Sequence, residues 1–536
     1  MRLNIHELGA REEWRRNGFV LPEFDIAGMI RATRAEPTWV HFGAGNIFRV
    51  FPAVRQQALL NADEARTGIV VAEGYDWEII DRVYRPFDNL SVAVILKENG
   101  DMEKTVVASI AESLKARPGD PDFERLREIF RSPSLQMVTF TITEKGYRLD
   151  WNGQTIPAVA DDLRDGPAEP KSFPGMAAAL VYERYRAGGG PLALVSMDNC
   201  SHNGEVLRGM VTAFARAWSG AGLTDAGFAD YVGDEERLAF PWTMIDKITP
   251  RPDARVAKAL AEAGLSGMGA TITAKDTYIA PYVNAEEIEY LVVEDSFPNG
   301  RPALEKAGVI FTDRTTVDRA ERMKVSTCLN PIHTAIGIFG CLLGFDSVAD
   351  LMRDPDIGRF AAILGYDEGM KVVADPGVID PKVFLREVLE RRFANPYVPD
   401  TPQRLTTDAS QGFPVRFGVT INAYMARKDL DPRDLRCIPL ALAGWFRYLL
   451  RVDDEGRPYE LSPDPVATEK AEMLAGRSVG GKETTGALLR PVLSDRELFG
   501  TDLAAAGLTE RIEDYFSELS SGWGAVRRVL HRVVSE

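Results

Sequence analysis

The chain has 536 residues, which is longer than one hydrophobic core usually supports, so roughly two to four domains are expected. Its composition, 45% hydrophobic and 26% charged, is that of a globular protein. The net charge of −16 argues against a general binder of nucleic acids or of anionic membranes, because either partner needs a basic field. A small acidic substrate remains compatible with this charge, since a few local cations are enough to hold it.

The few cysteines and histidines limit the redox and metal chemistry that the sequence predicts. Four cysteines lie far apart without a CxxC pair, which favours reduced thiols and a cytoplasmic protein: Cys200, Cys328, Cys341 and Cys437. No histidine is spaced from another histidine or a cysteine as in a zinc site, so we expect no metal. The N-terminus lacks the apolar region of a signal peptide and no segment reaches 18 uninterrupted apolar residues, so no membrane span is expected.

The first strong pattern along the chain is a strand, a glycine turn and a helix. Residues 1–36 are predicted to form a polar, helical lead-in, and residues 38–42 (TWVHF) are typical of a short buried strand. This strand runs directly into a turn that would approach a dinucleotide pyrophosphate, formed by Gly43, Ala44, Gly45, Asn46 and Ile47. A helix is predicted over residues 53–60, beginning at Pro52, which places its N-terminus several residues beyond the glycines.

The next predicted strand adds a second mark of a dinucleotide-binding fold. Residues 68–72 (GIVVA) end on Glu73, where a carboxylate would bind the adenosine ribose hydroxyls. A carboxylate at this place repels a 2′-phosphate, so NAD is favoured over NADP. Asp76 is a rival for the role, and a solvated acid at the end of a strand is the alternative interpretation of Glu73.

Strands and helices then alternate as far as residue 293. Strands are predicted at 91–96, 104–111, 137–143, 192–196 and 289–293, and helices at 123–130 and 176–185. The alternation predicts an α/β protein with an N-terminal Rossmann-type, doubly wound and mostly parallel sheet. Ligands of such sheets bind beyond the carboxyl ends of strands, where Glu144 and Asn199 fall, although both also suit ordinary turns.

A second, mainly α-helical domain is predicted beyond a change of composition near residue 285. Segments with a period of 3.6 residues occur at 317–323, 332–343, 381–393, 422–427 and 438–452. We therefore divide the chain into an NAD-binding domain, residues 1–290, and a helical substrate and catalytic domain, residues 291–536. Residues 453–485 are polar and rich in glycine and proline, which indicates a surface excursion.

One stretch of the helical domain, MKVSTCLNPIHTAIGIFGCLLG, gathers three side chains suited to carbonyl chemistry. Lys324 can pass a proton, Asn330 can hold a developing oxyanion and His333 can orient a substrate. Asn330 followed by Pro331 predicts a helix N-cap and first helical position, so these groups would lie at the mouth of a buried helix. A surface lysine, an ordinary cap and a first-turn histidine are the alternative interpretations.

A polar segment, DASQGFPVR, precedes another predicted helix of the same domain. Arg416 within it could hold a substrate carboxylate in a bidentate pair. A surface arginine is the commoner explanation of such a residue.

Seven sequence motifs are distributed over most of the chain. They are HFGAGNIFR from His41, TEKGY from Thr143, VSMDNCSHNG from Val195, FPWTMIDKITPRPD from Phe240, VVEDSFPNGRPALE from Val292, MKVSTCLNPIH from Met323 and DASQGFPVRF from Asp408. Together they resemble the polyol-specific long-chain dehydrogenases, which include mannitol 2-dehydrogenase, fructuronate reductase and tagaturonate reductase. The resemblance implies a Rossmann-type domain, a helical domain, an active site between them and zinc-independent hydride transfer with NAD.

The resemblance also implies roles for individual residues. Lys324 resembles the general acid/base, and Asn199 and Asn330 resemble the amides that polarise the reacting oxygen. His333 resembles the substrate-orienting imidazole, and Glu321 matches a position that helps relay the proton. One departure concerns spacing, because five residues separate Lys324 from Asn330 where the family usually has four. An extra residue rotates a helical position by about 100°, so family geometry requires a bulge or a helix break here.

The sequence TCLNPIHTAIGIFGCLLG, which follows Lys324, is most similar to the hexuronate branch of these dehydrogenases. This resemblance implies reduction of fructuronate to mannonate. Asp246, Lys247 and Arg416 are the candidate substrate ligands, the latter two for its carboxylate. Fructose and tagaturonate are alternative substrates, and a nicotinamide-binding regulatory protein without turnover is the alternative of another class. The expected partner is therefore a small sugar acid or polyol, with no nucleic acid and no membrane. The oligomeric state stays open, with a monomer among the options.

Overall fold

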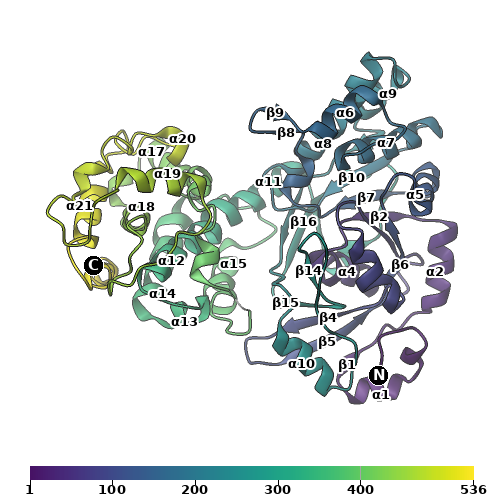
Figure 1. Cartoon of the computed structure of the whole chain (residues 1–536), viewed down its shortest axis with the longest axis horizontal. Helices are drawn as coiled ribbons and strands as arrows, with labels where there is room; N and C mark the ends of the chain where they lie inside the picture. Colours follow the sequence, from purple (N-terminus) through teal and green to yellow (C-terminus); the bar gives the residue numbers. More distant parts are fainter. Residues whose placement is uncertain (399) are drawn as a thin grey trace. The chain divides into compact units, whose positions relative to one another are not determined.

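The computed structural model describes residues 1–398 and 400–536, and the chain forms two compact units, Met1–Asp318 and Arg319–Glu536 (Figure 1). The sequence prediction put the boundary at residues 290 and 291. Strand β16 (Tyr290–Glu294) pairs there with β12 (Thr243–Asp246), so the first unit continues beyond that position.

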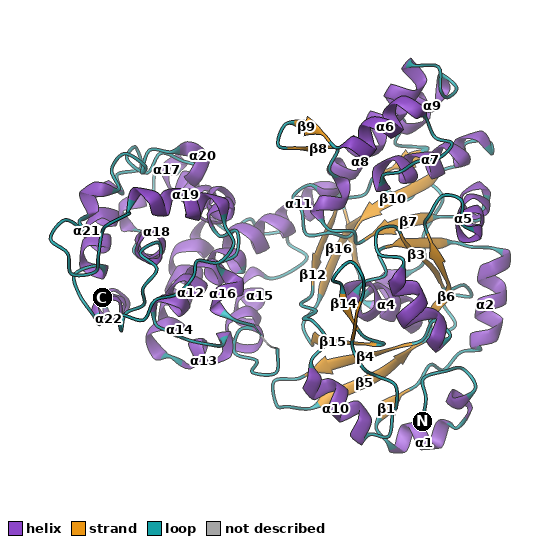
Figure 2. Ribbon diagram, viewed as in Figure 1, coloured by secondary structure: helices purple, strands orange, loops and turns teal. Residues whose placement is uncertain are grey.

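A six-stranded parallel sheet forms the centre of the first unit, with the strands drawn in orange in Figure 2. In spatial order its strands are β11 (Leu238–Ala239), β10 (Leu192–Ser196), β7 (Met137–Phe140), β2 (Trp39–Phe42), β3 (Ile69–Glu73) and β6 (Ile110–Lys115). The chain starts this sheet in the middle, at β2, builds outward through β3 and β6, and then returns to β7 on the other side. This is the order of a doubly wound dinucleotide-binding sheet, whose switch point lies between β2 and β7.

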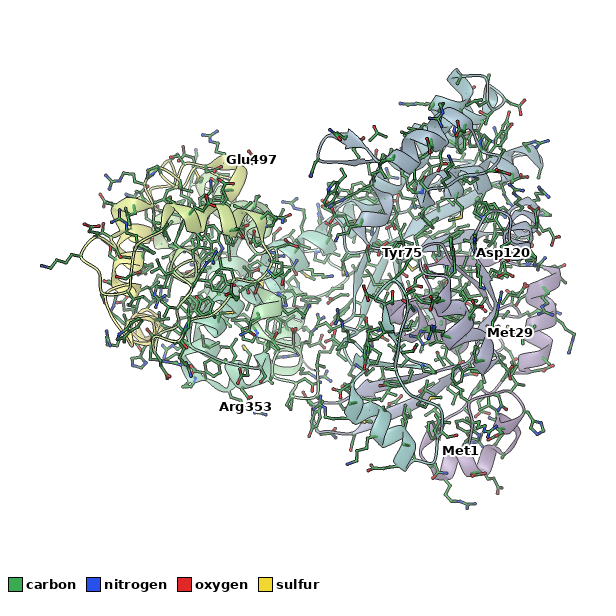
Figure 3. The ribbon with its side chains drawn as sticks, viewed as in Figure 1. Met1, Met29, Tyr75, Asp120, Arg353 and Glu497 are labelled. Carbon is green, nitrogen blue, oxygen red and sulfur yellow. The ribbon has the colours of Figure 1, made fainter. Side chains whose placement is uncertain are left out.

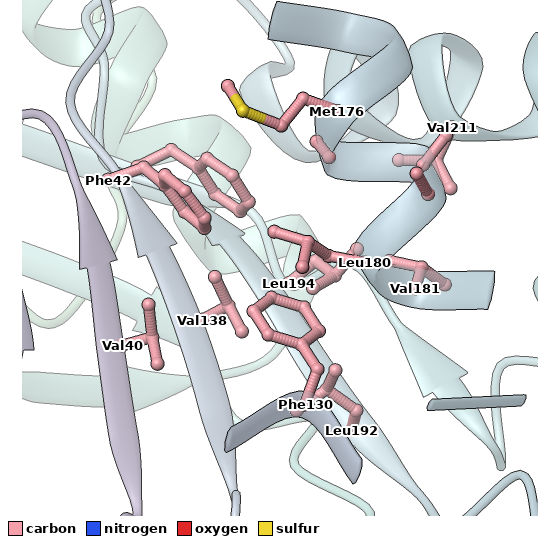
Figure 4. Close-up of a cluster of buried hydrophobic side chains, with 14 of the residues drawn as sticks. Val40, Phe42, Phe130, Val138, Met176, Leu180, Val181, Leu192, Leu194 and Val211 are labelled. Carbon is pink, nitrogen blue, oxygen red and sulfur yellow. The ribbon is translucent and has the colours of Figure 1, made fainter. Parts of the chain in front are cut away.

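Alternating side chains of β2 serve the two faces of this sheet. Val40 and Phe42 point to one face and join a large apolar cluster with helices α5 (Pro121–Arg131), α7 (Phe173–Arg186) and α8 (Asn203–Gly220) (Figure 4). Trp39 points to the other face and packs with α3 (Asn46–Val50), α4 (Pro52–Asn61) and the smaller sheets. Both faces are covered, which explains the nearly continuous apolar strands in the sequence.

A four-stranded sheet lies beside the central one. Its order is β1 (Phe19–Val20), β5 (Met102–Val107), β4 (Ser91–Leu96) and β15 (Tyr282–Glu286). The single strand predicted at 104–111 was wrong, because β5 and β6 belong to different sheets. The chain turns between them at Ala108 and Ser109, where the Ala108 amide donates to Gln57 at 2.7 Å and the Ser109 hydroxyl donates to the Ala53 carbonyl at 2.6 Å.

The remaining elements of the first unit are a small third sheet, two hairpins and surrounding helices. The sheet joins β12, β16 and β17 (Ile310–Thr312), and the hairpins are β8 (Asp150–Trp151) with β9 (Gln154–Thr155) and β13 (Thr271–Ile272) with β14 (Tyr278–Ile279). The helices are α1 (Arg11–Arg16), α2 (Ile26–Ala35), α3 (Asn46–Val50), α4 (Pro52–Asn61), α5 (Pro121–Arg131), α6 (Pro157–Asp165), α7 (Phe173–Arg186), α8 (Asn203–Gly220), α9 (Gly227–Gly233) and α10 (Ala254–Glu262). Helix α11 (Arg314–Met323) crosses the division between the units.

The second unit is helical, as predicted. Its helices are α12 (Asn330–Leu342), α13 (Val348–Arg353), α14 (Pro355–Ala362), α15 (Pro381–Glu387), α16 (Pro402–Leu405), α17 (Val419–Ala426), α18 (Cys437–Tyr448), α19 (Pro465–Met473), α20 (Arg496–Phe499), α21 (Thr509–Leu519) and α22 (Ala525–Ser535). Every residue of α18 is buried, and α12 packs against it. A helix that is apolar on all sides forms the centre of a core.

One helical stretch, Arg314–Leu342, is long and apolar enough to cross a membrane by length and composition alone. Its apolar window is 83% buried inside the structure, which is the behaviour of a core helix.

Several helices of the second unit contain a π-helical segment, in which each amide bonds the carbonyl five residues before it. Within the described residues these segments are Lys324–Cys328, Ile363–Glu368, Val388–Arg392 and Pro414–Gly418, and a further one, Ile80–Tyr84, lies in the first unit. Such segments are rare in proteins and occur frequently at functional sites.

Candidate active site

The turn after β2 has the form that the sequence predicted. Gly43 adopts φ +110°, and a Cβ there would overlap the Thr141 carbonyl at the end of the neighbouring strand, so only glycine fits. At Gly45 a Cβ would meet no atom within 4 Å. The fold therefore does not require glycine at this second position, and the open space is what a closely approaching phosphate group needs.

The predicted helix beginning at Pro52 is present as α4 (Pro52–Asn61), and a short helix that was not predicted precedes it. Helix α3 (Asn46–Val50) starts directly after Gly45 and includes Ile47. A helix therefore starts closer to the glycines than the sequence indicated. Proline carries no backbone N–H, and the chain breaks at Phe51 (φ −123°, ψ −77°) before the second helix.

Glu73 ties the glycine turn to the loop that follows β3. One carboxylate oxygen accepts from the Ala44 amide at 2.9 Å, and the other accepts from the amides of Tyr75 at 2.8 Å and Asp76 at 3.1 Å. Figure 3 labels Tyr75 at this loop. Burial raises the pKa of Glu73. An ionised carboxylate has about four acceptor sites, so capacity remains for a ribose hydroxyl. The rival acid, Asp76, instead accepts from the Thr273 hydroxyl at 2.6 Å.

Two buried residues that the sequence analysis missed support the same turn. The Arg49 guanidinium donates to the Ala280 carbonyl at 2.7 Å and to Asn46 Oδ1 at 2.9 Å. The Tyr84 hydroxyl donates to the Ala44 carbonyl at 3.0 Å, and burial raises the pKa of this hydroxyl. An arginine within the apolar run NIFRVF was the available signal for a buried structural cation.

The loops after β7 and β10 meet at the same edge of the sheet. The Asp198 carboxylate accepts from the amides of Ile142 at 2.9 Å and Thr143 at 3.0 Å and from the Tyr147 hydroxyl at 2.6 Å. Burial raises the pKa of Asp198. Asn199, the predicted oxygen-polarising amide, follows Asp198 directly and is exposed.

The two predicted substrate ligands near β12 are buried. Asp246 is the last residue of β12, and the side chain of Lys247 is 1% exposed with its ammonium 2.7 Å from Glu289. Arg55 also pairs with Glu289. A substrate carboxylate would have to compete with this ion pair, so the geometry favours a structural role for Lys247.

In the second unit, Lys324 begins a π-turn. The Leu329 amide bonds the Lys324 carbonyl at 3.0 Å, five residues back, and the Thr420 hydroxyl donates to the Ser326 carbonyl within the turn at 3.3 Å. The chain then breaks at Leu329 (φ −127°, ψ −67°) before α12 starts. The spacing required either a bulge or a helix break, and both are present between Lys324 and Asn330.

Asn330 was predicted to cap α12, and this was wrong. The cap position is Leu329, which has no side-chain hydrogen bond to the helix, and Asn330 is the first helical residue. The π-turn moves the break one residue earlier than the Asn-Pro pair suggests. The amide of Asn330 thus projects from the first turn of a buried helix without serving as its cap.

His333 lies one turn further into α12, and its ring centroid is 5.9 Å from that of Phe393. Burial lowers the pKa of His333 well below its ordinary value, and the guanidinium groups of Arg404, Arg416 and Arg392 lower it further. The imidazole is therefore neutral at physiological pH.

Arg416 reaches the same end of α12 from the π-helical segment Pro414–Gly418. Its guanidinium donates to the Thr334 hydroxyl at 2.5 Å, and burial lowers its pKa. In residues 1–398 and 400–536 no carboxylate forms an ion pair with it, whereas Arg404 is paired with Asp400. Arg404 and Arg392 were not found from the sequence, because their proximity to His333 depends on tertiary packing.

Glu321 lies in α11, one helical turn before Lys324, and is partly buried. Its role in a proton relay stays a prediction. Among the described residues, no three His, Cys, Asp or Glu side chains are grouped so that they could hold a metal ion.

Comparison with known proteins places both units in one family. The mannitol dehydrogenase Rossmann domain matches residues 37–306, and the mannitol dehydrogenase C-terminal domain matches residues 316–520. A D-mannonate oxidoreductase of Thermotoga maritima is 50% identical over 537 aligned positions, which cover 100% of this chain and 99% of the relative. A mannitol 2-dehydrogenase of Cereibacter sphaeroides is 30% identical and covers 89% of this chain and 93% of its own length.

A solved structure agrees with these matches. The ternary complex of Pseudomonas fluorescens mannitol 2-dehydrogenase with NAD and D-mannitol superposes with a TM-score of 0.74 at 27% identity, covering 100% of both chains. The predicted resemblance and the predicted fold class are confirmed. The chain belongs to the mannitol dehydrogenase family.

Proposed function

We propose that the protein is an NAD-dependent enzyme that interconverts D-fructuronate and D-mannonate. The support is the full-length similarity to a D-mannonate oxidoreductase together with the position of Arg416. Within the described residues this partly buried guanidinium hydrogen-bonds the neutral Thr334 hydroxyl and forms no ion pair, although Asp408 and Asp464 act on it electrostatically, so its charge is available to a ligand. This observation favours a keto sugar acid over a neutral ketose.

The first unit fits NAD. The open space at Gly45 suits the pyrophosphate, and the Glu73 carboxylate suits the ribose hydroxyls while disfavouring a 2′-phosphate. The solved relative was crystallised with NAD, which agrees with this choice. When bound, the nicotinamide supplies or accepts the hydride.

In the second unit, Lys324 gives a proton to the keto oxygen during reduction and removes one from the alcohol during oxidation. Asn330 donates a hydrogen bond to that oxygen as its negative charge grows, and we assign the same role to Asn199. Neutral His333 hydrogen-bonds a substrate hydroxyl without adding another positive charge. The lysine needs no metal for this chemistry, so the proposed reaction is zinc-independent.

Arg416 holds the sugar carboxylate in this scheme. A guanidinium offers two parallel N–H groups to a carboxylate, and such bidentate pairs are stronger than neutral hydrogen bonds. The substrate is the only partner that the proposal requires. We place the enzyme in the cytoplasm, in agreement with four free cysteines.

The test is the loss of NADH absorbance with purified protein and fructuronate, tagaturonate or fructose. We expect turnover that is selective for fructuronate. Selectivity for fructose or tagaturonate would reject this substrate assignment. Absence of turnover on all three, with NADH still bound, would favour the regulatory protein without activity.

A further inference from the structure

The backbone conformation at Gly412 does not require a glycine. It closes the short 3-10 turn Ser410–Gly412, and its φ lies outside the left-handed region that favours glycine. A Cβ built on it would overlap Nε and Cζ of Arg416 and would lie 2.8 Å from its Cδ. The space that a side chain would fill is therefore occupied by the arginine.

The Arg416 side chain lies across Gly412, and this path determines the position of its guanidinium group. The side chain passes over the glycine and ends on the Thr334 hydroxyl, in the helical turn that also carries His333. The three nearest atoms to the hypothetical Cβ all belong to Arg416, so an added methyl group would move this side chain in particular. The guanidinium would lose its bond to Thr334 and its place beside the imidazole.

We propose that Gly412 is a positioning residue for substrate charge: its missing side chain lets Arg416 lie against Thr334, where the guanidinium selects a keto sugar that carries a carboxylate. This inference rests on the proposed function, because it assigns Arg416 to the substrate carboxylate. It extends that function by identifying a residue that never touches the substrate and yet sets its class.

The experiment measures binding of D-mannonate and of uncharged D-mannitol to the full-length protein saturated with NADH, with which neither ligand can be oxidised, by titration calorimetry. In Gly412→Ala we expect mannonate affinity to fall about tenfold to a hundredfold, the range of a lost hydrogen bond to a charged group. Mannitol affinity should change by less than about threefold, because no charge is lost for that ligand. Equal weakening of both ligands, or no weakening of mannonate, would overturn the proposal.

Matched variants separate positioning from damage to the fold. Gly358→Ala makes the same change in α14, where a Cβ would meet only ordinary contact at 3.5 Å, and should leave both affinities unchanged. Thr334→Val removes the hydroxyl partner and should weaken mannonate selectively even if Gly412→Ala fails to fold. In an Arg416→Ala background, Gly412→Ala should have no further effect, whereas a fully additive effect would contradict the proposal.

The outcome also distinguishes this inference from the proposed function. Selective mannonate binding that depends on Gly412, without fructuronate turnover, would support the inference and reject the function. Wild-type protein that turns over fructuronate but binds mannitol as tightly as mannonate would support the function and reject the inference.

Discussion

The turn after β2 and the turn before α12 share one feature, a break between helices next to a proline, and are otherwise built in opposite ways. At Phe51 the break follows a turn whose polar groups are backbone amides, fixed by the buried carboxylate of Glu73. At Leu329 the break follows a π-turn, and the groups around it are side chains. The first turn offers backbone groups to a cofactor, and the second offers the single side chains to which we assign the chemistry.

The two histidines with lowered pKa values, His41 and His333, show the same difference. The ring of His41, on β2, lies 2.6 Å from the Thr139 hydroxyl and 2.9 Å from that of Thr141, and burial lowers its pKa to about 3. His333 owes part of its lowered pKa to three guanidinium groups. One imidazole is neutral because the sheet encloses it, and the other is neutral also because a cationic site surrounds it.

The largest expected effect comes from a substitution in the turn before α12 alone. Lys324→Ala should lower turnover by about 100-fold or more, because the acid/base group is lost, while NADH binding is retained. Steady-state kinetics and NADH fluorescence titration measure the two quantities. Lys382→Ala, an exposed lysine at the start of α15, is the control. Turnover within threefold of wild type would remove Lys324 from the chemistry.

A substitution in the turn after β2 should weaken cofactor binding and lower the stability of the protein. Glu73→Ala leaves three backbone amides without their acceptor, so we expect a loss on the order of 3 kcal/mol in the free energy of unfolding and about tenfold weaker NAD binding. Denaturant unfolding and calorimetry measure these changes. Glu73→Gln, which keeps one acceptor oxygen, should lie between wild type and Glu73→Ala. Unchanged NAD affinity in both variants would show that the carboxylate serves the fold alone.

A smaller effect is expected from removing the extra residue of the π-turn. Deleting Val325 should close the segment into an ordinary helical turn and restore four residues between Lys324 and Asn330, with turnover within about tenfold of wild type. Inserting an alanine after Val325 exceeds what one bulge absorbs and should abolish turnover. A deletion as damaging as Lys324→Ala would mean that the π-turn itself shapes the site.

The smallest expected effect is a change in the pKa of His333 that His41 does not share. In Arg416→Ala the pKa of His333 should rise toward its ordinary value because one neighbouring positive charge is gone, whereas the pKa of His41 should stay near 3. The chain has only five histidines, so nitrogen-15 labelling of histidine resolves them by NMR. Equal shifts in both rings would indicate a general loosening of the protein.

The lowered pKa of His41 also predicts how the stability of the folded protein changes as the pH falls. The folded state keeps this ring neutral, whereas the unfolded chain binds a proton below about pH 6.5. Its contribution to stability is therefore complete above pH 6.5 and is lost as the pH falls toward 3.

The sheet and its glycine turn were largely predictable from the sequence, because apolar runs, glycines and the spacing of Glu73 are local signals. The start of α3 was not, since Pro52 is a stronger local signal than the short helix before it. The turn that separates β5 from β6 has hydrogen bonds from Ala108 to Gln57 and from Ser109 to Ala53, which no pattern of period two reveals.

The candidate site in the helical unit was predictable in its residue types but less so in its geometry. A period of 3.6 residues identifies α12, yet a one-residue bulge leaves almost no trace in that period, so the cap was misplaced at Asn330. The burial of Lys247 depends on Glu289, and the charge around His333 depends on Arg404 and Arg392. These contacts join residues far apart in the sequence.

The π-turn at Lys324–Cys328 has a consequence for how relatives of this protein are compared. A π-turn adds a residue without shifting the helices on either side, so an alignment gap belongs inside this segment and not at Asn330. An ungapped alignment would pair Asn330 with a neighbour of the family asparagine and score the amide as lost. Searches that demand a fixed number of residues between the lysine and the asparagine would therefore discard this chain, in which both residues are present.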